Sequence, residues 1–195
     1  MEKQLLFASS NKHKIAEIKA LLPQSLKLIS MEDIAFQDEL PETADTIEGN
    51  AIQKAQTLFN AVQITCFADD TGLVIPALNG EPGVYSARYA GHQRNADDNM
   101  NLVLEKLAKS NDRKAYFKTV IAYTNSTETF LFEGRIDGEI TTKKRGSQGF
   151  GYDPIFQPKG CEKTFAEMTQ SEKNQMSHRS LAIEKLIQYL LESEK

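Results

Sequence analysis

Cysteine and histidine are scarce in this sequence, which has two cysteines and three histidines among 195 residues. So few thiol and imidazole ligands make a zinc centre an unattractive interpretation. The two cysteines, Cys66 and Cys161, are far apart and no secretory signal is apparent, so we expect reduced thiols rather than a disulfide. These features predict a cytoplasmic location.

Long apolar runs are also lacking. The apolar stretch over residues 5–8 is far too short for a signal peptide, and no run approaches the length of a membrane span. Lys and Arg total 23 and Asp and Glu total 27, and the net charge of −4 argues against nucleic-acid or membrane partners. With no repeat, low-complexity segment or linker, the pattern predicts a single domain over residues 1–195.

Strand and helix patterns are mixed along the chain. Short or alternating apolar runs predict strands at residues 4–8, 26–30, around Cys66, at 114–124 and at 128–136, with 138–142 as a candidate continuation. Apolar residues at helical spacing predict helices at 12–22, 48–62, 96–109 and 179–192. This mixture indicates an α/β or α+β domain.

Two adjacent acids, Asp69 and Asp70, follow an apolar run over residues 64–68 that is typical of a buried strand. We expect the strand to end at this pair. Because adjacent carboxylates repel each other, such a pair usually needs a cation. Mg²⁺ suits it, since this ion takes oxygen ligands and bridges carboxylates to phosphates, and Glu42 or Glu48 is a candidate third ligand. An acidic turn that caps the next segment is an equally good alternative.

The junction between the first predicted strand and the first predicted helix is a candidate anion site. Its residues are Ser9, Ser10, Asn11, Lys12, His13 and Lys14. Free backbone N–H groups and the positive end of the helix dipole suit a phosphate at such a junction. The glycines of a Walker motif are missing, so a simple N-cap followed by solvated lysines is the favoured interpretation of this segment alone.

Two further polar groups lie near the C-terminus. In the glycine-rich segment around Phe150 and Tyr152, the backbone could approach a ligand and an aromatic ring could stack on a base, although core packing of these rings is an equal alternative. Lys173, His178 and Arg179 can donate hydrogen bonds to a phosphate or to a carbonyl group of a base. A lone histidine is, however, more commonly a polar residue at a helix entrance.

These segments occur in an order that resembles one enzyme family. The matching segments are Ser9-x-Asn11-x-x-Lys14, Ala68-Asp69-Asp70-Thr71-Gly72-Leu73, Pro82-Gly83-Val84-Tyr85-Ser86-Ala87-Arg88-Tyr89, Gly149-Phe150-Gly151-Tyr152-Asp153-Pro154-Ile155-Phe156 and Ser177-His178-Arg179. Over nearly its whole length the chain is similar to the inosine/xanthosine triphosphate pyrophosphatase family. The resemblance implies Mg²⁺-dependent hydrolysis of deaminated purine nucleoside triphosphates, namely ITP, dITP and XTP, to the monophosphate and pyrophosphate.

The same resemblance implies an α/β fold with a long, twisted mixed sheet, two lobes flanking a nucleotide-binding cleft, and a homodimer. Asp70 matches the proton acceptor and a metal ligand, and Asp69 matches its companion at the metal. The implied substrate-binding residues are Ser9, Ser10, Asn11, Lys12, His13, Lys14, Thr71, Phe150, Gly151, Tyr152, Asp153, Lys173, His178 and Arg179. The chain departs from the family pattern at Pro41, Ala44 and Gly49, which leaves the third metal ligand open.

Two other functions remain as alternatives. One is a related pyrophosphatase that acts on other modified nucleotides, and the other is a nucleotide sensor without catalysis. Selectivity for hypoxanthine and xanthine requires a donor to the 6-oxo group, from Arg179 or from a backbone N–H, because such a donor would face the amino group of adenine.

Overall fold

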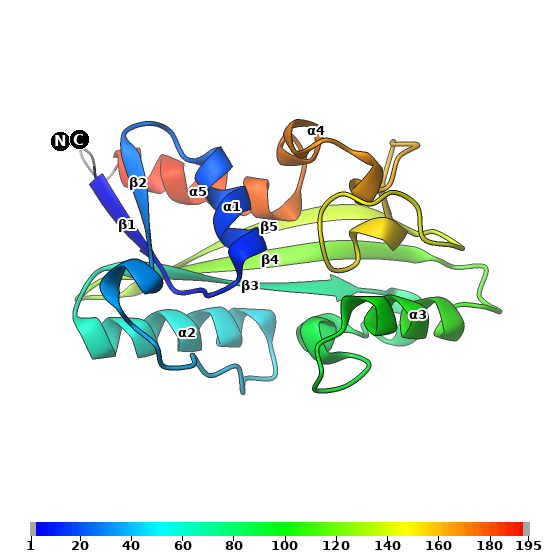
Figure 1. Cartoon of the computed structure of the whole chain (residues 1–195), viewed down its shortest axis with the longest axis horizontal. Coiled ribbons are helices and arrows are strands. Elements are labelled where there is room, and N and C mark those ends of the chain that lie inside the picture. Colours follow the sequence, from blue (N-terminus) through cyan, green and yellow to red (C-terminus); the bar gives the residue numbers. More distant parts are fainter. Residues whose placement is uncertain (1–2, 193–195) are drawn as a thin grey trace. The chain divides into compact units, whose positions relative to one another are not determined.

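The computed structural model describes residues 3–192, which form an α/β fold with one mixed six-stranded sheet (Figure 1). The strands lie in the order β2-β1-β3-β4-β5-β6 and have the bounds β1 Lys3–Phe7, β2 Leu26–Ser30, β3 Cys66–Val74, β4 Lys114–Thr124, β5 Thr129–Ile140 and β6 Phe156–Pro158. β1 pairs in parallel with β2 and β3, whereas β5 and β6 are antiparallel. The mixed sheet is therefore confirmed.

The helices are α1 Lys12–Leu21, α2 Ile47–Val62, α3 Ala96–Lys106, α4 Gln170–Asn174 and α5 His178–Glu192. Among the described residues, none of these helices is long and apolar enough to cross a membrane.

The described chain divides into two compact units, each discontinuous in sequence. Unit 1 comprises residues 3–70, 119–134 and 179–192, and unit 2 comprises residues 71–118 and 135–178. The two units correspond to the two predicted lobes. The predicted domain over 1–195 also includes residues 1–2 and 193–195, which lie outside the described residues.

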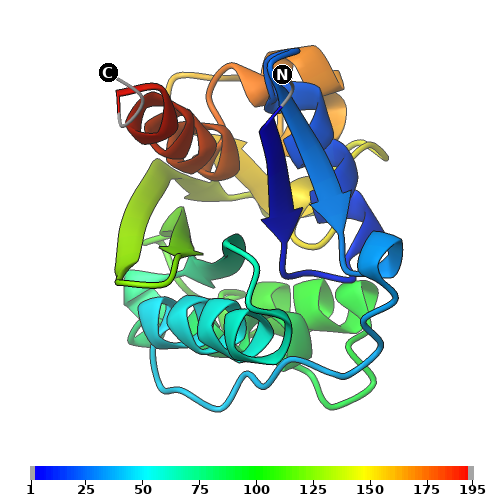
Figure 2. The ribbon, with the colours of Figure 1, turned by 90° about the vertical axis from the view of Figure 1, so that its left-hand side faces the viewer.

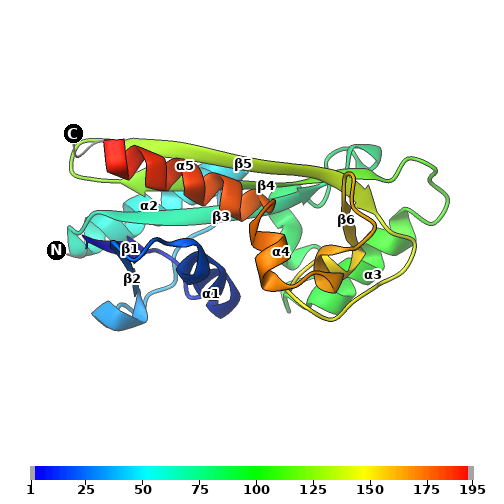
Figure 3. The same ribbon diagram turned by 90° about the horizontal axis from the view of Figure 1, so that it is seen from above.

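Unit 1 has an apolar cluster on each face of its strands. Because side chains alternate along a strand, Leu5 and Phe7 of β1 belong to one cluster and Leu6 to the other. The first cluster includes buried side chains of α1 and α5, and the second includes Ala55 and Leu58 of α2. Figure 2 faces this unit and shows α2 on one side of the strands and α1 and α5 on the other, and Figure 3 shows the same helices from above. The strands of unit 1 are thus covered on both faces.

Unit 2 has a separate core built around aromatic rings. Phe117 of β4 packs against Phe156 and Phe165, with ring centroids 4.6 and 6.2 Å apart. Val103 of α3 and the ring of Tyr152 belong to the same buried cluster. Unit 2 therefore buries an apolar core from its own residues.

β3 differs from the sequence-based expectation. The predicted strand ends at Asp69 and Asp70, whereas β3 continues through them to Val74. Both acids are buried, and each forms an ion pair with a lysine of unit 1, Asp69 with Lys14 and Asp70 with Lys54. These partners compensate the carboxylates inside the strand, so the alternative of an acidic turn is wrong.

Other element boundaries shifted as well. The predicted strand at 128–136 runs on into its candidate continuation at 138–142, and the two form the single strand β5, which ends at Ile140. Gly138 permits a close approach to β6, where a Cβ would lie 2.3 Å from the carbonyl oxygen of Gln157. α3 ends three residues before its predicted end. α4 was not predicted, although the capping box formed by Thr169 and Glu172 is visible in the sequence.

Candidate active site

Asp69 lies at the centre of a buried ionic cluster in unit 1. Its Oδ1 accepts a hydrogen bond from Lys14 Nζ at 2.9 Å, and its Oδ2 accepts from Nε and Nη2 of Arg179 at 3.2 Å each. Nη1 of Arg179 donates to the carboxylate of Glu17, which is also buried. The cluster joins α1, β3 and α5 through buried ion pairs. Both oxygens of Asp69 are thus held by cations of the protein itself.

The surrounding charges control the protonation of this cluster. Burial acts to raise the pKa of Asp69, but Lys14, Arg179 and Lys54 together outweigh it and hold that pKa well below its usual range. Burial lowers the pKa of Lys14, and the attraction of Asp69 offsets this only in part. Asp69 is therefore a fixed anion at any physiological pH.

Asp70 has a different environment from its neighbour. Its Oδ1 accepts from Lys54 Nζ at 2.8 Å, and the same ammonium donates to Glu42 Oε1 at 2.8 Å. Burial raises the pKa of Asp70 above its usual value, and the nearby Lys54 and Lys14 offset this only in part. Of the two acids, Asp70 therefore has the higher pKa.

Lys54 and Glu17 complete these contacts, and the sequence interpretation missed both. Burial acts to lower the pKa of Lys54, but Asp70, Asp69 and Glu42 outweigh it and raise that pKa. A signal was present in the sequence, because Lys54 lies between Ala51 and Ala55 on the apolar side of a predicted helix, where an unpaired charge would be costly. Such a residue must have a buried partner, but the sequence does not say which one.

The start of α1 has the predicted cap. Asn11 is the N-cap, and its Oδ1 accepts from the backbone N–H groups of His13 and Lys14 at 3.0 and 3.2 Å. Ser9 Oγ accepts from the N–H of Asn11 at 3.2 Å. Ser10, Lys12 and His13 are exposed, but the side chain of Lys14 is only 15% exposed and binds Asp69. The capping interpretation is confirmed, whereas the expectation of a solvated Lys14 is wrong.

A second polar group lies within unit 2. Asp153 Oδ2 accepts from Lys173 Nζ at 2.6 Å and from the N–H of Phe150 at 2.9 Å. The ammonium of Lys173 lies 5.1 Å from the ring centroid of Phe150. Asp153 thus fixes both the backbone of the glycine-rich segment and the cation beside its aromatic ring.

The other predicted residues of unit 2 have packing contacts. Tyr152 is buried and its hydroxyl donates to the carbonyl oxygen of Ser86 at 2.8 Å. The ring of His178 stacks on Phe117 with centroids 4.5 Å apart. Thr71 follows Asp70 in β3 and is half-buried. For Tyr152, the contacts favour the core-packing alternative.

Gly149 and Gly151 allow a matched test of the glycine-rich segment. Both have positive φ, +72° and +62°, but a Cβ at Gly149 would lie 2.0 Å from Asp153 Oδ2, whereas one at Gly151 meets nothing within 4 Å. Gly151→Ala should lower the free energy of unfolding by about 1–2 kcal/mol, through backbone strain alone. Gly149→Ala should lower it by about 1–3 kcal/mol more, because it displaces Asp153 from its partners. Urea unfolding of both variants measures the difference, and equal losses would contradict it.

The predicted site residues thus form two groups, each within one unit. Asn11, Lys14, Asp69, Asp70 and Arg179 lie in unit 1, and Thr71, Phe150–Asp153, Lys173 and His178 lie in unit 2. Among the described residues, no three His, Cys, Asp or Glu side chains are arranged to hold a metal ion by themselves.

A model of the Ham1 family matches residues 5–189. A dITP/XTP pyrophosphatase of Flavobacterium johnsoniae is 54% identical over 187 residues, which cover 96% of this chain and 97% of the relative. A second dITP/XTP pyrophosphatase, from Porphyromonas gingivalis, is 47% identical over 192 residues, with 98% of each chain covered.

Solved structures agree with this similarity. The Staphylococcus aureus Ham1 protein has a TM-score of 0.88 and 42% identity, with 99% of this chain and 100% of that chain covered. A HAM1 protein from Coxiella burnetii has a TM-score of 0.89 and 39% identity, with 97% and 99% covered. The family match extends over most of the chain, and the relatives share both its sequence and its fold. The chain belongs to the Ham1 family.

Proposed function

We propose that this protein hydrolyses deaminated purine nucleoside triphosphates, namely ITP, dITP and XTP, to the monophosphate and pyrophosphate, and so removes them from the nucleotide pool. The names of the relatives from Flavobacterium johnsoniae and Porphyromonas gingivalis support this substrate class. The observation that carries the proposal is the pair formed by Glu42 and Asp70, which meet at one ammonium group, 2.8 Å from each. Such a site suits phosphoryl chemistry, which depends on positioned charge.

The carboxylates present fit Mg²⁺. Glu42 and Asp70 lie close together because both bind the ammonium of Lys54, and two carboxylates with substrate phosphates and waters are a usual ligand set for this ion. Glu42 is preferred to Glu48 as the further ligand because it shares Lys54 with Asp70. Both oxygens of Asp69 already bind Lys14 and Arg179, so we assign it the role of holding these cations rather than a metal. When bound, Mg²⁺ would neutralise charge on the phosphates.

The residues of unit 1 have distinct roles in this proposal. Asp70, with its raised pKa, orients the attacking water and accepts its proton. Lys54 holds Asp70 and Glu42 in place through its two ion pairs. Lys14 and the start of α1, with Ser9, Ser10, Asn11, Lys12 and His13, bind the triphosphate and stabilise the leaving pyrophosphate.

Residues of unit 2 would recognise the base. A purine stacked on Phe150 would place its 6-oxo group near the ammonium of Lys173, which lies 5.1 Å from that ring. The 6-amino group of adenine would face the same donor and be rejected. Arg179 binds Asp69 and Glu17 within unit 1, whereas Lys173 lies beside the ring of Phe150, so Lys173 is preferred to Arg179 as the donor. Thr71, Gly151, Asp153 and His178 complete the proposed nucleotide site, whereas Tyr152 packs in the core of unit 2.

The proposal extends to the whole molecule. Residues 1–195 act as one catalytic domain, and units 1 and 2 both contribute residues to the reaction. We propose a cytoplasmic homodimer whose partner is the nucleotide, with neither nucleic acid nor a membrane as a partner.

Pyrophosphate release tests this proposal directly. With Mg²⁺, kcat/KM for dITP and XTP should exceed that for dATP by at least about a thousandfold, because a buried donor left facing an amino group is a strong discriminator. Removal of divalent cations by EDTA should abolish release, and added Mg²⁺ should restore it. If modified pyrimidine triphosphates are cleaved faster than dITP or XTP, the alternative pyrophosphatase is correct. If no triphosphate yields pyrophosphate, the remaining alternative is the nucleotide sensor without catalysis.

A further inference from the structure

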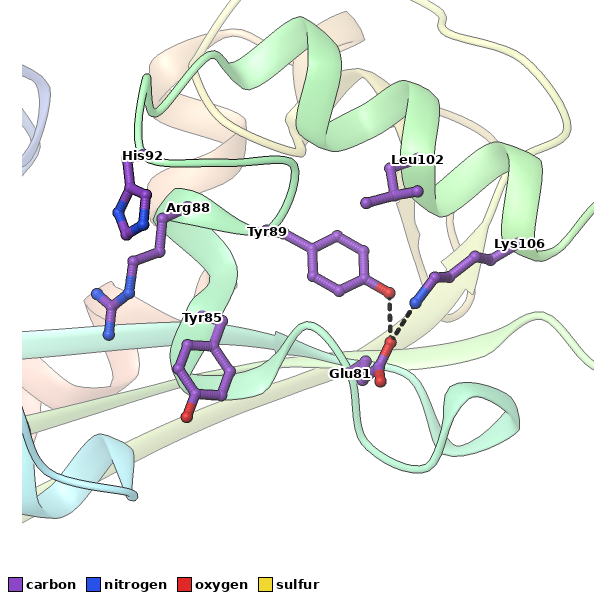
Figure 4. Close-up of a pocket in the computed structure, with 7 residues that line it drawn as sticks. All are labelled: Glu81, Tyr85, Arg88, Tyr89, His92, Leu102 and Lys106. Carbon is purple, nitrogen blue, oxygen red and sulfur yellow. Dashed lines mark hydrogen bonds and ion pairs between the residues drawn. The ribbon is translucent and has the colours of Figure 1, made fainter.

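Unit 2 has a hollow of about 450 Å³ that the proposed reaction does not use (Figure 4). This volume lies in the range of about 300–1,000 Å³ that is usual for small-molecule sites. It is lined by Glu81, Tyr85, Arg88, Tyr89, His92, Leu102 and Lys106. Three of these residues belong to the Pro82–Tyr89 motif, for which the reaction provides no role.

Two tyrosine rings and two cations shape the hollow. The guanidinium of Arg88 lies 5.3 Å from the ring centroid of Tyr85, and Lys106 Nζ lies 4.9 Å from that of Tyr89. Tyr85 is 53% exposed, which is unusual for so large a ring. An exposed aromatic face beside a cation is suited to a planar ring that carries negative charge.

The charge of the lining has the opposite sign to that of the chain. Glu81 Oε2 accepts from the Tyr89 hydroxyl and from Lys106 Nζ, both at 2.6 Å, so the two donors meet at one carboxylate oxygen (Figure 4). Arg88 and Lys106 carry two positive charges against the one negative charge of Glu81, whereas the whole chain has a net charge of −4. The lining residues themselves thus carry one more positive than negative charge, which favours an anionic ligand.

The motif is fixed from its inner side. Ser86 Oγ donates to the carbonyl oxygen of Gly83 at 2.6 Å and accepts from the N–H of Leu73 at 2.9 Å. The buried Asn99 Oδ1 accepts from the N–H of Ala90 at 2.7 Å, just beyond the motif. These bonds order the backbone that presents Tyr85 and Arg88, so less conformational entropy is lost when a ligand binds.

We propose that this hollow is a second binding site, for an aromatic compound that carries a phosphate or carboxylate group. The ring of the ligand stacks on Tyr85, and its anionic group accepts hydrogen bonds from the guanidinium of Arg88. The site lies entirely within unit 2 and is independent of the proposed hydrolysis.

NMR titration of the full chain with phenyl phosphate tests the proposal. The ring resonances of Tyr85 and Tyr89 should shift and saturate. Arg88→Gln should weaken binding about tenfold, because a hydrogen bond to a charged group is lost. Arg135→Gln is the matched control, since Arg135 also stacks on a tyrosine, 3.7 Å from the centroid of Tyr116, but does not line the hollow. The Arg135→Gln variant should bind phenyl phosphate as tightly as the unmodified protein does.

Tyr85→Leu provides a second variant, because an exposed ring can be removed without disturbing the core. It should weaken phenyl phosphate binding, and cyclohexyl phosphate should bind the unmodified protein more weakly than phenyl phosphate does. Absence of saturable shifts, or equal binding by the Arg88 and Arg135 variants, would overturn the proposal. Shifts that depend on protein concentration but not on the probe would assign this surface to a contact between copies of the chain. Because turnover is not measured, none of these results depends on the proposed activity.

Discussion

Asp70→Asn should lower kcat for pyrophosphate release from dITP by at least about a hundredfold, the contribution usual for a positioned general base. An amide cannot accept the proton of the attacking water, and it is a weaker ligand for Mg²⁺ than a carboxylate. Binding of dITP should be retained in part, because Lys14 and the residues of unit 2 are unchanged. Steady-state kinetics and a binding titration with dITP measure the two effects separately.

The fold should tolerate this replacement. Burial raises the pKa of Asp70, and a carboxyl whose pKa is higher in the folded than in the unfolded protein opposes folding where it is ionised. At neutral pH the melting temperature of the variant should therefore not fall, and Lys54 keeps its ion pair with Glu42. Asp112→Asn, at an exposed position, is the control and should retain full activity. Full turnover by the Asp70 variant would rule out Asp70 as the base.

Arg179→Leu should lower the free energy of unfolding by about 3–5 kcal/mol at neutral pH, the usual effect of removing one partner from a buried ion pair. The replacement leaves Glu17 and Asp69 buried without the guanidinium that bridges them. Chemical denaturation at neutral pH measures the loss. The exposed Arg135→Leu is the control, with an expected change within about 0.5 kcal/mol.

The pH dependence of this loss follows from the sign of the pKa changes. In the unmodified protein the pKa of Asp69 is depressed, so the stability from its pairing is present above the ordinary carboxyl pKa and disappears only in strong acid. Without Arg179 the pKa values of Asp69 and Glu17 should rise, because burial is no longer balanced. The difference in free energy of unfolding between the unmodified protein and the Arg179→Leu variant should therefore shrink as the pH falls and both carboxyls are protonated.

Glu17→Gln added to the Arg179 variant should recover part of the loss, because it removes one unpaired charge. A deficit that is the same at neutral and mildly acidic pH, or a double variant no more stable than the single one, would show that packing rather than charge causes the loss.

The fold could be predicted from the sequence where apolar periodicity is strong. The strands around residues 4–8 and 26–30 and the helix at 48–62 were found within one or two residues, because each has one clear apolar face. The end of β3 was predicted wrongly. The prediction used only the local preference of two adjacent aspartates for turns, and it took no account of residues elsewhere in the chain. The ion pairs that keep these acids in the strand come from Lys14 and Lys54, which are distant in sequence.

The candidate site shows the same limit. The sequence indicated Asp70, Lys14 and Lys173 as polar residues in suitable segments, but it could not show which oxygen pairs with which nitrogen. Lys54 and Glu17 were missed because a charged residue on a helix is usually solvated. Only the packed structure shows that these two are buried, and burial is what makes their partners essential.

The ionic cluster around Asp69 has a consequence for synthesis of the chain on the ribosome. Lys14 and Glu17 are made early, Asp69 later and Arg179 close to the end, after the whole of unit 2. Until α5 emerges, the nascent chain holds two carboxylates whose shared guanidinium does not yet exist. Unit 1 therefore cannot close in its native form from the N-terminal segment alone, and its ionic cluster is completed only when α5 has been made.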